Sequence, residues 1–149
     1  MNNGISEIYS MIQELSWYFG NQGFNGKCCG DLSLVEFMAV KKVSEKDDIT
    51  MRDIGIALNI TKSGASKIID RLENKGYVLR VQSPIDGRVC CVVITDKGSC
   101  VITKIVESYT GYVGEMLKNL EADAITHVTS GLEILINSVR KQGFIKSVE

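Results

Sequence analysis

Residues 50–95 read TMRDIGIALNITKSGASKIIDRLENKGYVLRVQSPIDGRVCCVVIT, and this stretch decides the fold. Thr50 has Asp53 three positions later, the pattern of a capping box at a helix start. Asn59 ends this first helix, because asparagine tolerates the left-handed conformation that follows helices. Thr61 caps a second helix at once, so the pair predicts a helix-turn-helix. The expected inner residues of the two helices are Ile54, Ala57, Leu58, Ala65, Ile68, Ile69 and Leu72, with Gly76 at the end.

The segment after the second helix has the pattern of a β-hairpin. Residues 78–82 and 89–94 are rich in β-branched side chains, and the SPIDGR segment between them contains a proline and a glycine typical of turns. Apolar spacing predicts further helices over residues 5–19, 32–46, 96–120 and 122–141. The helix over 32–46 begins at Asp31 or Ser33, with Leu34, Phe37, Met38 and Lys41 along one side.

These elements predict a mainly α protein with a small β-hairpin wing, organised as a single domain over residues 1–149. A winged helix-turn-helix lobe covers about residues 32–95, and a helical region covers about 1–30 and 96–149. The terminal helices have more apolar surface than a small winged core covers. Because closed two-fold dimers are the commonest oligomers, we expect a homodimer formed through these helices; a larger monomeric bundle is the alternative.

Composition narrows the class of protein. With 149 residues, 44% of them hydrophobic and 23% charged, the chain is expected to be globular. It has neither an apolar run of the roughly 20 residues that a membrane span needs nor the pattern of a secretory signal. We therefore expect a cytoplasmic protein without a membrane partner. The five cysteines are an odd number, which favours reduced thiols over a disulfide framework.

The positive charge of the chain is concentrated in one segment. The whole chain has a formal charge of −1, whereas residues 61–88 contain six basic and three acidic side chains. The six are Lys62, Lys67, Arg71, Lys75, Arg80 and Arg88. A basic patch on an acidic body is typical of a protein that binds a polyanion.

The second helix of the pair presents a face suited to DNA. Its buried stripe leaves Lys62, Ser63, Ser66 and Lys67 outward, and its first turn has no acid, so its amides and positive dipole end are open to an anion. Lysine and serine supply hydrogen bonds to phosphates and base edges. The alternative is an ordinary capped surface helix.

The hairpin tip strengthens the prediction of DNA binding. Arg88 follows the turn, and arginine favours the narrow, electronegative minor groove. Asp86 is placed to orient its guanidinium through a bidentate pair. The alternative is a surface salt bridge, worth about 1 kcal/mol or less.

About 45 residues of this stretch resemble the MarR family of winged helix-turn-helix regulators. The resemblance rests on Asp70-Arg71-Leu72-Glu73-Asn74-Lys75-Gly76, on the wing Asp86-Gly87-Arg88, and on Ile94-Thr95-Asp96-Lys97-Gly98. It implies a homodimer with intertwined terminal helices, two lobes on a pseudo-palindromic operator, and release by a ligand or by thiol chemistry. The residues expected to contact or orient DNA are Thr61, Lys62, Ser63, Gly64, Ser66, Lys67, Arg71, Asp86 and Arg88.

The signal that releases DNA is a separate question. Cys28 and Cys29 follow Lys27 in a Gly-rich loop that precedes a helix start. A nearby cation and a helix N-terminus both favour the thiolate form of cysteine. Adjacent thiols also suit a thiophilic metalloid or an oxidant, although cysteine is often a small buried hydrophobe. That buried role is the expectation for Cys100 and for the pair Cys90 and Cys91, of which one faces outward by strand alternation. An aromatic ligand near Trp17, Tyr18, Phe19 and Phe37 is the alternative effector.

The sequence as a whole favours a DNA-binding transcriptional regulator, a repressor released by a small ligand or by thiol modification. The alternative is a winged-helix module that binds protein instead of DNA. An enzyme is not expected, because the sequence has no nucleophile–His–carboxylate set, phosphate loop or metal cluster, and His127 is its only histidine. No cofactor and no metal site are predicted.

Overall fold

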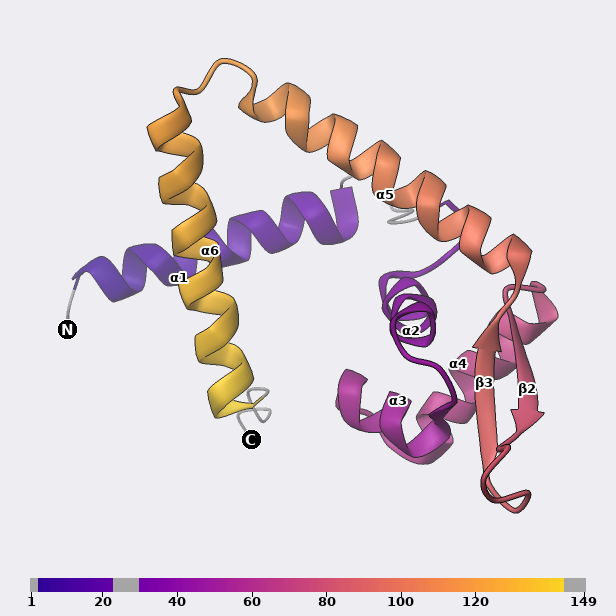
Figure 1. The fold of residues 1–149 in the computed structure, drawn as a ribbon. Helices are drawn as coiled ribbons and strands as arrows, with labels where there is room; N and C mark the ends of the chain where they lie inside the picture. Colours follow the sequence, from indigo (N-terminus) through magenta and orange to yellow (C-terminus); the bar gives the residue numbers. More distant parts are fainter. Residues whose placement is uncertain (1–2, 23–29, 144–149) are drawn as a thin grey trace. The chain divides into compact units, whose positions relative to one another are not determined.

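The computed structural model describes residues 3–22 and 30–143, in two units, Met1–Ile105 and Val106–Glu149 (Figure 1). The first unit begins with α1 (Asn3–Ser16) and a π-helical segment, η1 (Trp17–Gln22). It continues with α2 (Leu34–Glu45), β1 (Ile49–Thr50), α3 (Met51–Leu58), α4 (Lys62–Asn74), β2 (Val78–Gln82) and β3 (Cys90–Ile94). Helix α5 (Asp96–Leu117) starts in the first unit and ends in the second, which also contains α6 (Ala122–Gln142).

The helix starts of the lobe follow the sequence prediction. Ser33, and not Asp31, caps α2 through a capping box with Glu36, and Thr50 caps α3 through a capping box with Asp53. The Thr61 hydroxyl accepts a hydrogen bond from the Gly64 amide at 2.9 Å, which begins α4. Each cap satisfies amides that the first helical turn leaves without a partner.

The turn between α3 and α4 is also as predicted. Asn59 adopts the left-handed conformation with φ of 53° and ends α3. Gly55 is buried next to this turn, and a Cβ on it would lie 3.0 Å from the Ile60 carbonyl oxygen. The close approach of the two helices therefore requires a very small residue at this position.

The core of the lobe lies between α2, α3, α4 and the sheet. Ile54, Ile69, Leu72, Val78 and Val92 are fully buried there. The stripe predicted for α4 is confirmed, since Ala65 and Ile68 are buried as well. Two details of the prediction were wrong. In α2, the predicted side is not the buried face, because Leu34 and Lys41 on that side are exposed. The buried residues of α2 are Glu36, Ala39, Val40 and Val43. In α3, the predicted inner residue Ala57 is exposed.

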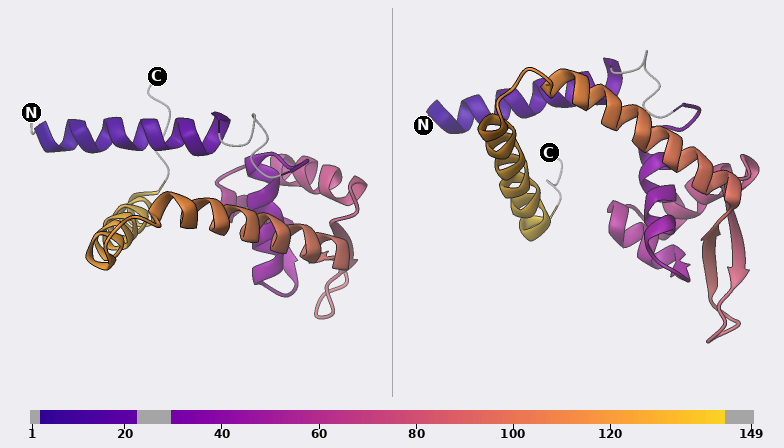
Figure 2. Two further views of the ribbon diagram at one scale, coloured as in Figure 1. Left: turned by 90° about the horizontal axis from the view of Figure 1, so that it is seen from above. Right: turned by 45° about the horizontal axis from the view of Figure 1, so that its top comes forward.

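The sheet has three antiparallel strands in the order β1-β3-β2, one more than the predicted hairpin. The short strand β1 pairs Ile49 with Val92 and Thr50 with Cys91, so it closes the free edge of β3. Two residues give too little pattern to be predicted from sequence alone. The β2–β3 hairpin projects beyond α2, α3 and α4, and Figure 2 shows this from two further directions.

The segment from Ile94 to Gly98 fixes the start of α5 on the sheet. The Thr95 hydroxyl donates to the Gly76 carbonyl at 2.7 Å and accepts from the Gly98 amide at 3.0 Å. A Cβ on Gly98 would overlap the Tyr77 carbonyl oxygen and lie 2.8 Å from Ile94 Cγ1. Threonine and glycine at this spacing are thus required by packing.

The terminal helices bury little of their apolar surface. Among the described residues, α6 has no buried side chain, and α1 exposes Ile5, Ile8, Ile12 and Leu15. No helix in residues 3–22 or 30–143 is long and apolar enough to cross a bilayer.

Candidate nucleic-acid interface

The first two turns of α4 present a polar face that contains two lysines. Lys62, Ser63 and Lys67 are exposed, Ser66 is partly buried, and the first turn contains no acid. Within residues 3–22 and 30–143, neither Lys62 nor Lys67 makes an ion pair. Both ammonium groups are therefore available to an external anion. Gly64 carries no side chain on this turn, and a Cβ there would lie 3.2 Å from Thr61 Oγ1.

A cleft of about 470 Å³ lies between the start of α3, the start of α4 and the segment of the wing that leads from the tip into β3. It brings together Lys62 and Arg88, both predicted from sequence, and adds Arg52, which the prediction missed. Arg52 is exposed and follows Thr50 in the first turn of α3. The cleft is lined by Thr50, Met51, Arg52, Asp53, Lys62, Arg88, Val89 and Cys90. Three cations against one acid give the cleft a positive charge, which is the charge that a phosphate or another anion would require.

The tip of the wing is a tight turn with a freely projecting arginine. The Ser83 hydroxyl accepts from the amides of Ile85 and Asp86, at 3.2 and 3.4 Å. One carboxylate oxygen of Asp86 accepts from both the amide and Nε of Arg88, at 3.0 and 3.3 Å. The predicted bidentate pair is therefore wrong: only one guanidinium nitrogen contacts Asp86, and the Arg88 side chain stays 92% exposed.

Arg71, which the sequence placed among the DNA contacts, is 58% exposed but also lies near a buried acid of the protein. Its Nη1 lies 3.7 Å from Oε1 of the buried Glu36, while Lys75 Nζ lies 2.9 Å from Oε2 of the same carboxylate. Burial raises the pKa of Glu36, but hydrogen bonds from Lys75 and the Ser33 amide, together with the charges of Lys75 and Arg71, lower it overall. This cluster fastens the end of α4 to the start of α2.

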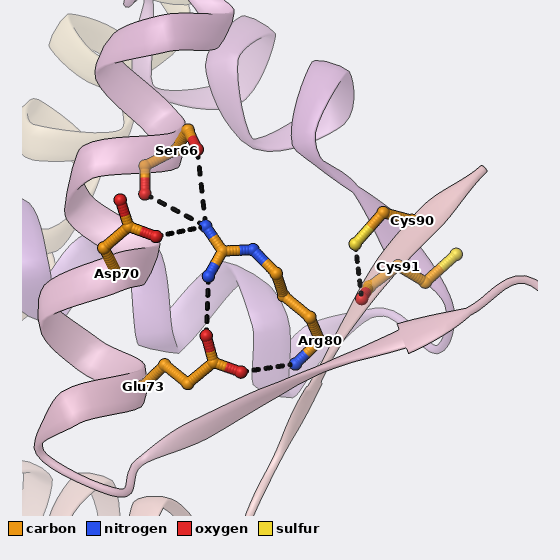
Figure 3. A network of polar contacts seen from close by, with 6 residues as sticks. All are labelled: Ser66, Asp70, Glu73, Arg80, Cys90 and Cys91. Atoms are coloured by element: carbon orange, nitrogen blue, oxygen red, sulfur yellow. Dashed lines mark hydrogen bonds and ion pairs between the residues drawn. The ribbon is translucent and has the colours of Figure 1, made fainter. Parts of the chain in front are cut away.

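Arg80 of β2 forms a network with α4 that the sequence analysis missed (Figure 3). Its Nη2 lies 2.6 Å from Asp70 Oδ1, and its Nη1 lies 2.6 Å from Glu73 Oε2. Nη2 also donates to the carbonyl and hydroxyl oxygens of Ser66, both at 3.3 Å. Burial lowers the pKa of Arg80, but the hydrogen bonds and charges of the two carboxylates outweigh it and raise the pKa. Of the six cations in residues 61–88, Arg71, Lys75 and Arg80 thus serve internal contacts.

The cysteines divide between core and surface. Cys91 is buried and Cys90 is exposed, as strand alternation predicted. The expectation that Cys100 fills the core was wrong, because it is exposed. Cys28 and Cys29 lie outside the described residues.

Comparison with known proteins gives the relationship of this chain. Residues 32–90 match the model of the MarR family. This match covers the winged helix-turn-helix lobe of the chain. It is 26% identical over 102 residues to the HTH-type transcriptional regulator MhqR of Bacillus subtilis, over 68% of this chain and 70% of that protein. It is 27% identical over 108 residues to the regulator PapX of Escherichia coli, over 72% of this chain and 62% of PapX.

Solved structures of other proteins share the fold of this chain. FabT of Streptococcus pneumoniae in complex with DNA superposes with a TM-score of 0.77 and 21% identity, covering 96% of this chain and 100% of FabT. A MarR family protein from Bacillus stearothermophilus gives a TM-score of 0.82 at 18% identity, covering 94% and 99%. At this identity the likeness establishes the winged fold, and the residue contacts must be argued from the chain itself.

Proposed function

We propose that this protein is a regulator of the MarR family, which binds DNA sequence-specifically, controls transcription and acts as a repressor in the cytoplasm. The observation that supports this most directly is the cleft in which Arg52, Lys62 and Arg88 converge from three different elements. Solved structures show FabT bound to DNA and a mutant MarR of E. coli bound to operator DNA, and both share this fold.

The two parts of the interface have different tasks. Helix α4 enters the major groove, where Ser63 and Ser66 contact base edges and Lys62 and Lys67 contact phosphates. The wing brings Arg88 to the adjacent minor groove. Arg52 contacts a phosphate beside Lys62, at the cleft that both residues line.

The remaining predicted residues act on DNA through the protein. Thr61 caps α4 by accepting a hydrogen bond from the Gly64 amide. Gly64 has no side chain and so leaves room for the DNA backbone. Asp86 restrains Arg88 through its Nε, and Arg71 pairs with Glu36. None of these four roles requires a direct contact with a base.

We propose that two copies of the chain form the functional dimer on a pseudo-palindromic operator. The support is the exposed apolar surface of the terminal helices, such as Ile5 at 65% and Leu132 at 44% exposure. Exposed apolar stripes of this kind are typical of surfaces that a partner covers. A two-fold dimer places two copies of α4 against successive major grooves.

The proposed repressor releases DNA when an effector acts on the protein. We expect a small ligand, an oxidant or a thiophilic metalloid to act, with Cys28 and Cys29 as the candidate thiols. The alternative aromatic ligand site includes Trp17 and Tyr18, which are both more than half exposed. The test is release of bound DNA by a trivalent arsenical or a thiol oxidant, repeated with Cys28→Ser/Cys29→Ser and with Cys90→Ser. If the double variant still releases DNA fully, those two thiols are not the sensor.

DNA binding itself is tested by selecting duplexes from a randomised library with the purified full chain. The selected duplex should bind with a steep salt dependence, losing roughly a thousandfold in affinity between about 50 and 200 mM salt. Arg88→Ala should cost about 1–3 kcal/mol of binding, whereas Lys104→Ala on α5 should cost nothing measurable. Failure to enrich any sequence, or binding insensitive to salt, would overturn the proposal in favour of a protein-binding module.

A further inference from the structure

Three acceptors on one stripe of α4 converge on Arg80 of β2. Ser66, Asp70 and Glu73 are separated by four and three positions, so they lie along the same side of the helix. All three contact one guanidinium, and the Arg80 amide also donates to Glu73 Oε1 at 3.2 Å. Figure 3 shows the side chain of Arg80 reaching from the wing strand across to the helix.

The strand pattern explains why Arg80 points toward α4. Residues two apart in a strand lie on the same face, so Arg80 shares the face of Val78. Val78 is fully buried and begins the same strand, where β2 packs next to α4. Arg80 continues this contact outward from the core toward the exposed face of the helix, with its side chain 26% exposed.

One of the acceptors belongs to the proposed DNA-reading face. The hydroxyl of Ser66 accepts a hydrogen bond from Arg80 Nη2, which occupies one of its lone pairs. With that lone pair occupied, the hydroxyl can still donate its proton to another acceptor, such as a purine N7 or a phosphate oxygen. Without this contact the hydroxyl would rotate freely and could donate to its own helix instead.

The two carboxylates hold the guanidinium in place. Arg80 is restrained by Asp70 on one nitrogen and by Glu73 on the other, a planar fork that lysine does not reproduce. Asp70 is 57% exposed and three positions from Lys67, so it lies beside the proposed phosphate contacts. The same network therefore joins the wing to the recognition helix and keeps both acids engaged.

We propose that Arg80 is a positioning residue for sequence recognition, which orients the Ser66 hydroxyl and ties the wing strand to α4 without itself contacting DNA. The proposal rests on the proposed DNA-binding function. It differs from a direct role because Arg80 uses both terminal nitrogens inside the protein. It predicts that loss of Arg80 reduces the preference for the right sequence more than the affinity for DNA in general.

The experiment compares two probes, the duplex that the wild-type chain selects from a randomised library and a scrambled duplex of the same composition. Arg80→Met should weaken binding to the selected duplex about tenfold, the effect of one lost base contact, and to the scrambled duplex less than about threefold. The slope of affinity against salt should stay unchanged, because no phosphate contact is lost. Ser66→Ala should add no further loss in the Arg80→Met background, and Arg80→Lys should not rescue the sequence preference.

A second variant separates positioning from folding. Asp70→Asn/Glu73→Gln keeps the positive charge but removes the carboxylates that hold it, so it should also lower the ratio of selected to scrambled affinity. If Arg80→Met fails to melt cooperatively, this pair decides the question. Lys118→Met, which removes a cation paired with Glu115 on α5, is the matched control and should leave the ratio unchanged.

Three results would overturn the proposal. If Arg80→Met lost the same affinity for both duplexes, and the slope of log affinity against log salt fell in magnitude by about one, Arg80 would be a phosphate contact. Additive losses for Ser66→Ala and Arg80→Met would show that the two side chains act independently. An unchanged ratio in both the Arg80→Met and the Asp70→Asn/Glu73→Gln variants would remove any positioning role. A wild-type chain that selects no duplex is a different failure, since it overturns the DNA-binding function.

Discussion

Helices α4 and α6 repeat apolar residues at the same spacing, but they differ in how far these residues are buried. In α4, Ile69 and Leu72 are fully buried. In α6, the side chains of Leu132 and Val139 are 44% and 56% exposed. In the lobe, the neighbouring helices and the sheet of the same chain cover the stripe. Within its own unit, α6 has no buried side chain among the described residues. Helical spacing therefore identifies the apolar face, and the covering partner is a separate property that the spacing does not determine.

The starts of the helices show the same difference between the lobe and α6. Ser33, Thr50 and Thr61 each cap a helix of the lobe through a side-chain hydrogen bond. Glu121 stands at the cap position of α6 and makes no such bond. The lobe thus specifies its helices locally, while α6 depends more on tertiary or quaternary packing.

The largest expected effect is on the exposed stripe of α6. Leu132→Asp should dissociate the proposed dimer by about 4 kcal/mol or more, since a two-fold interface loses a buried leucine twice and gains two buried charges. Sedimentation velocity measures the change. Glu133→Gln, one position along, is the control and should remain dimeric. A wild-type chain that sediments as a monomer would show that another part of the chain covers this stripe.

The packing of the lobe gives the next largest effect. Gly98→Ala should lower the free energy of unfolding by about 3 kcal/mol, because the added methyl overlaps the Tyr77 carbonyl and crowds Ile94. Gly111→Ala in the same helix meets nothing within 4 Å and should raise it by about 0.5–1 kcal/mol. Urea denaturation measures both. Equal effects at the two glycines would contradict the packing argument.

The buried acid of the lobe gives a smaller, pH-dependent effect. Glu36→Gln should destabilise by about 1–2 kcal/mol at pH 7, because it removes the charge that pairs with Lys75. The pKa of Glu36 is lowered below its ordinary 4.5 in the folded protein, so its stabilisation is present above that value. The stabilisation is lost as the pH falls through the lowered pKa.

Urea titrations of wild type and Glu36→Gln at several pH values test this linkage. The two curves should converge as the pH falls below 4.5. Glu45→Gln removes an exposed pair with Lys42 and serves as the control with little effect at any pH. A constant difference between wild type and Glu36→Gln down to the acid transition would mean that the charge of Glu36 does not matter.

The smallest expected effect is at the helix caps. Glu121→Ser should stabilise by about 0.5–1 kcal/mol, because a serine hydroxyl can accept from a free amide at the start of α6. Thr50→Ala should have the opposite sign and about the same size, since α3 loses the bond to the Asp53 amide. Thermal melting measures both. A stabilising Thr50→Ala would contradict the role of its capping box.

Much of the lobe was predicted because its signals are local. Thr50, Asn59 and Thr61 act within three or four residues of themselves, and the bounds of α4 and β2 followed closely. The resemblance to the MarR family gave the winged fold, and the motif from Thr95 to Gly98 proved to be a packing requirement. In the interface, Lys62 and Arg88 were predicted and do line one cleft.

The errors concern contacts between residues far apart in the sequence. The sequence does not distinguish Arg80 from Arg52, because both are arginines in polar segments. In the structure Arg80 pairs with two acids of α4, whereas Arg52 lines the cleft. The buried side of α2 was misjudged because its Glu36 is neutralised by Lys75, 39 positions away. A charge pattern alone does not show which charges are already paired.

The sequence by itself determined the helix starts, the turn between α3 and α4, and the wing, because caps, turn residues and apolar periods act over a few positions. Only the tertiary structure decided which cations remain available for an anion and which apolar faces the chain covers by itself. The physical reason is that both properties depend on partners brought together by the fold, as Arg80 is with Asp70 and Glu73.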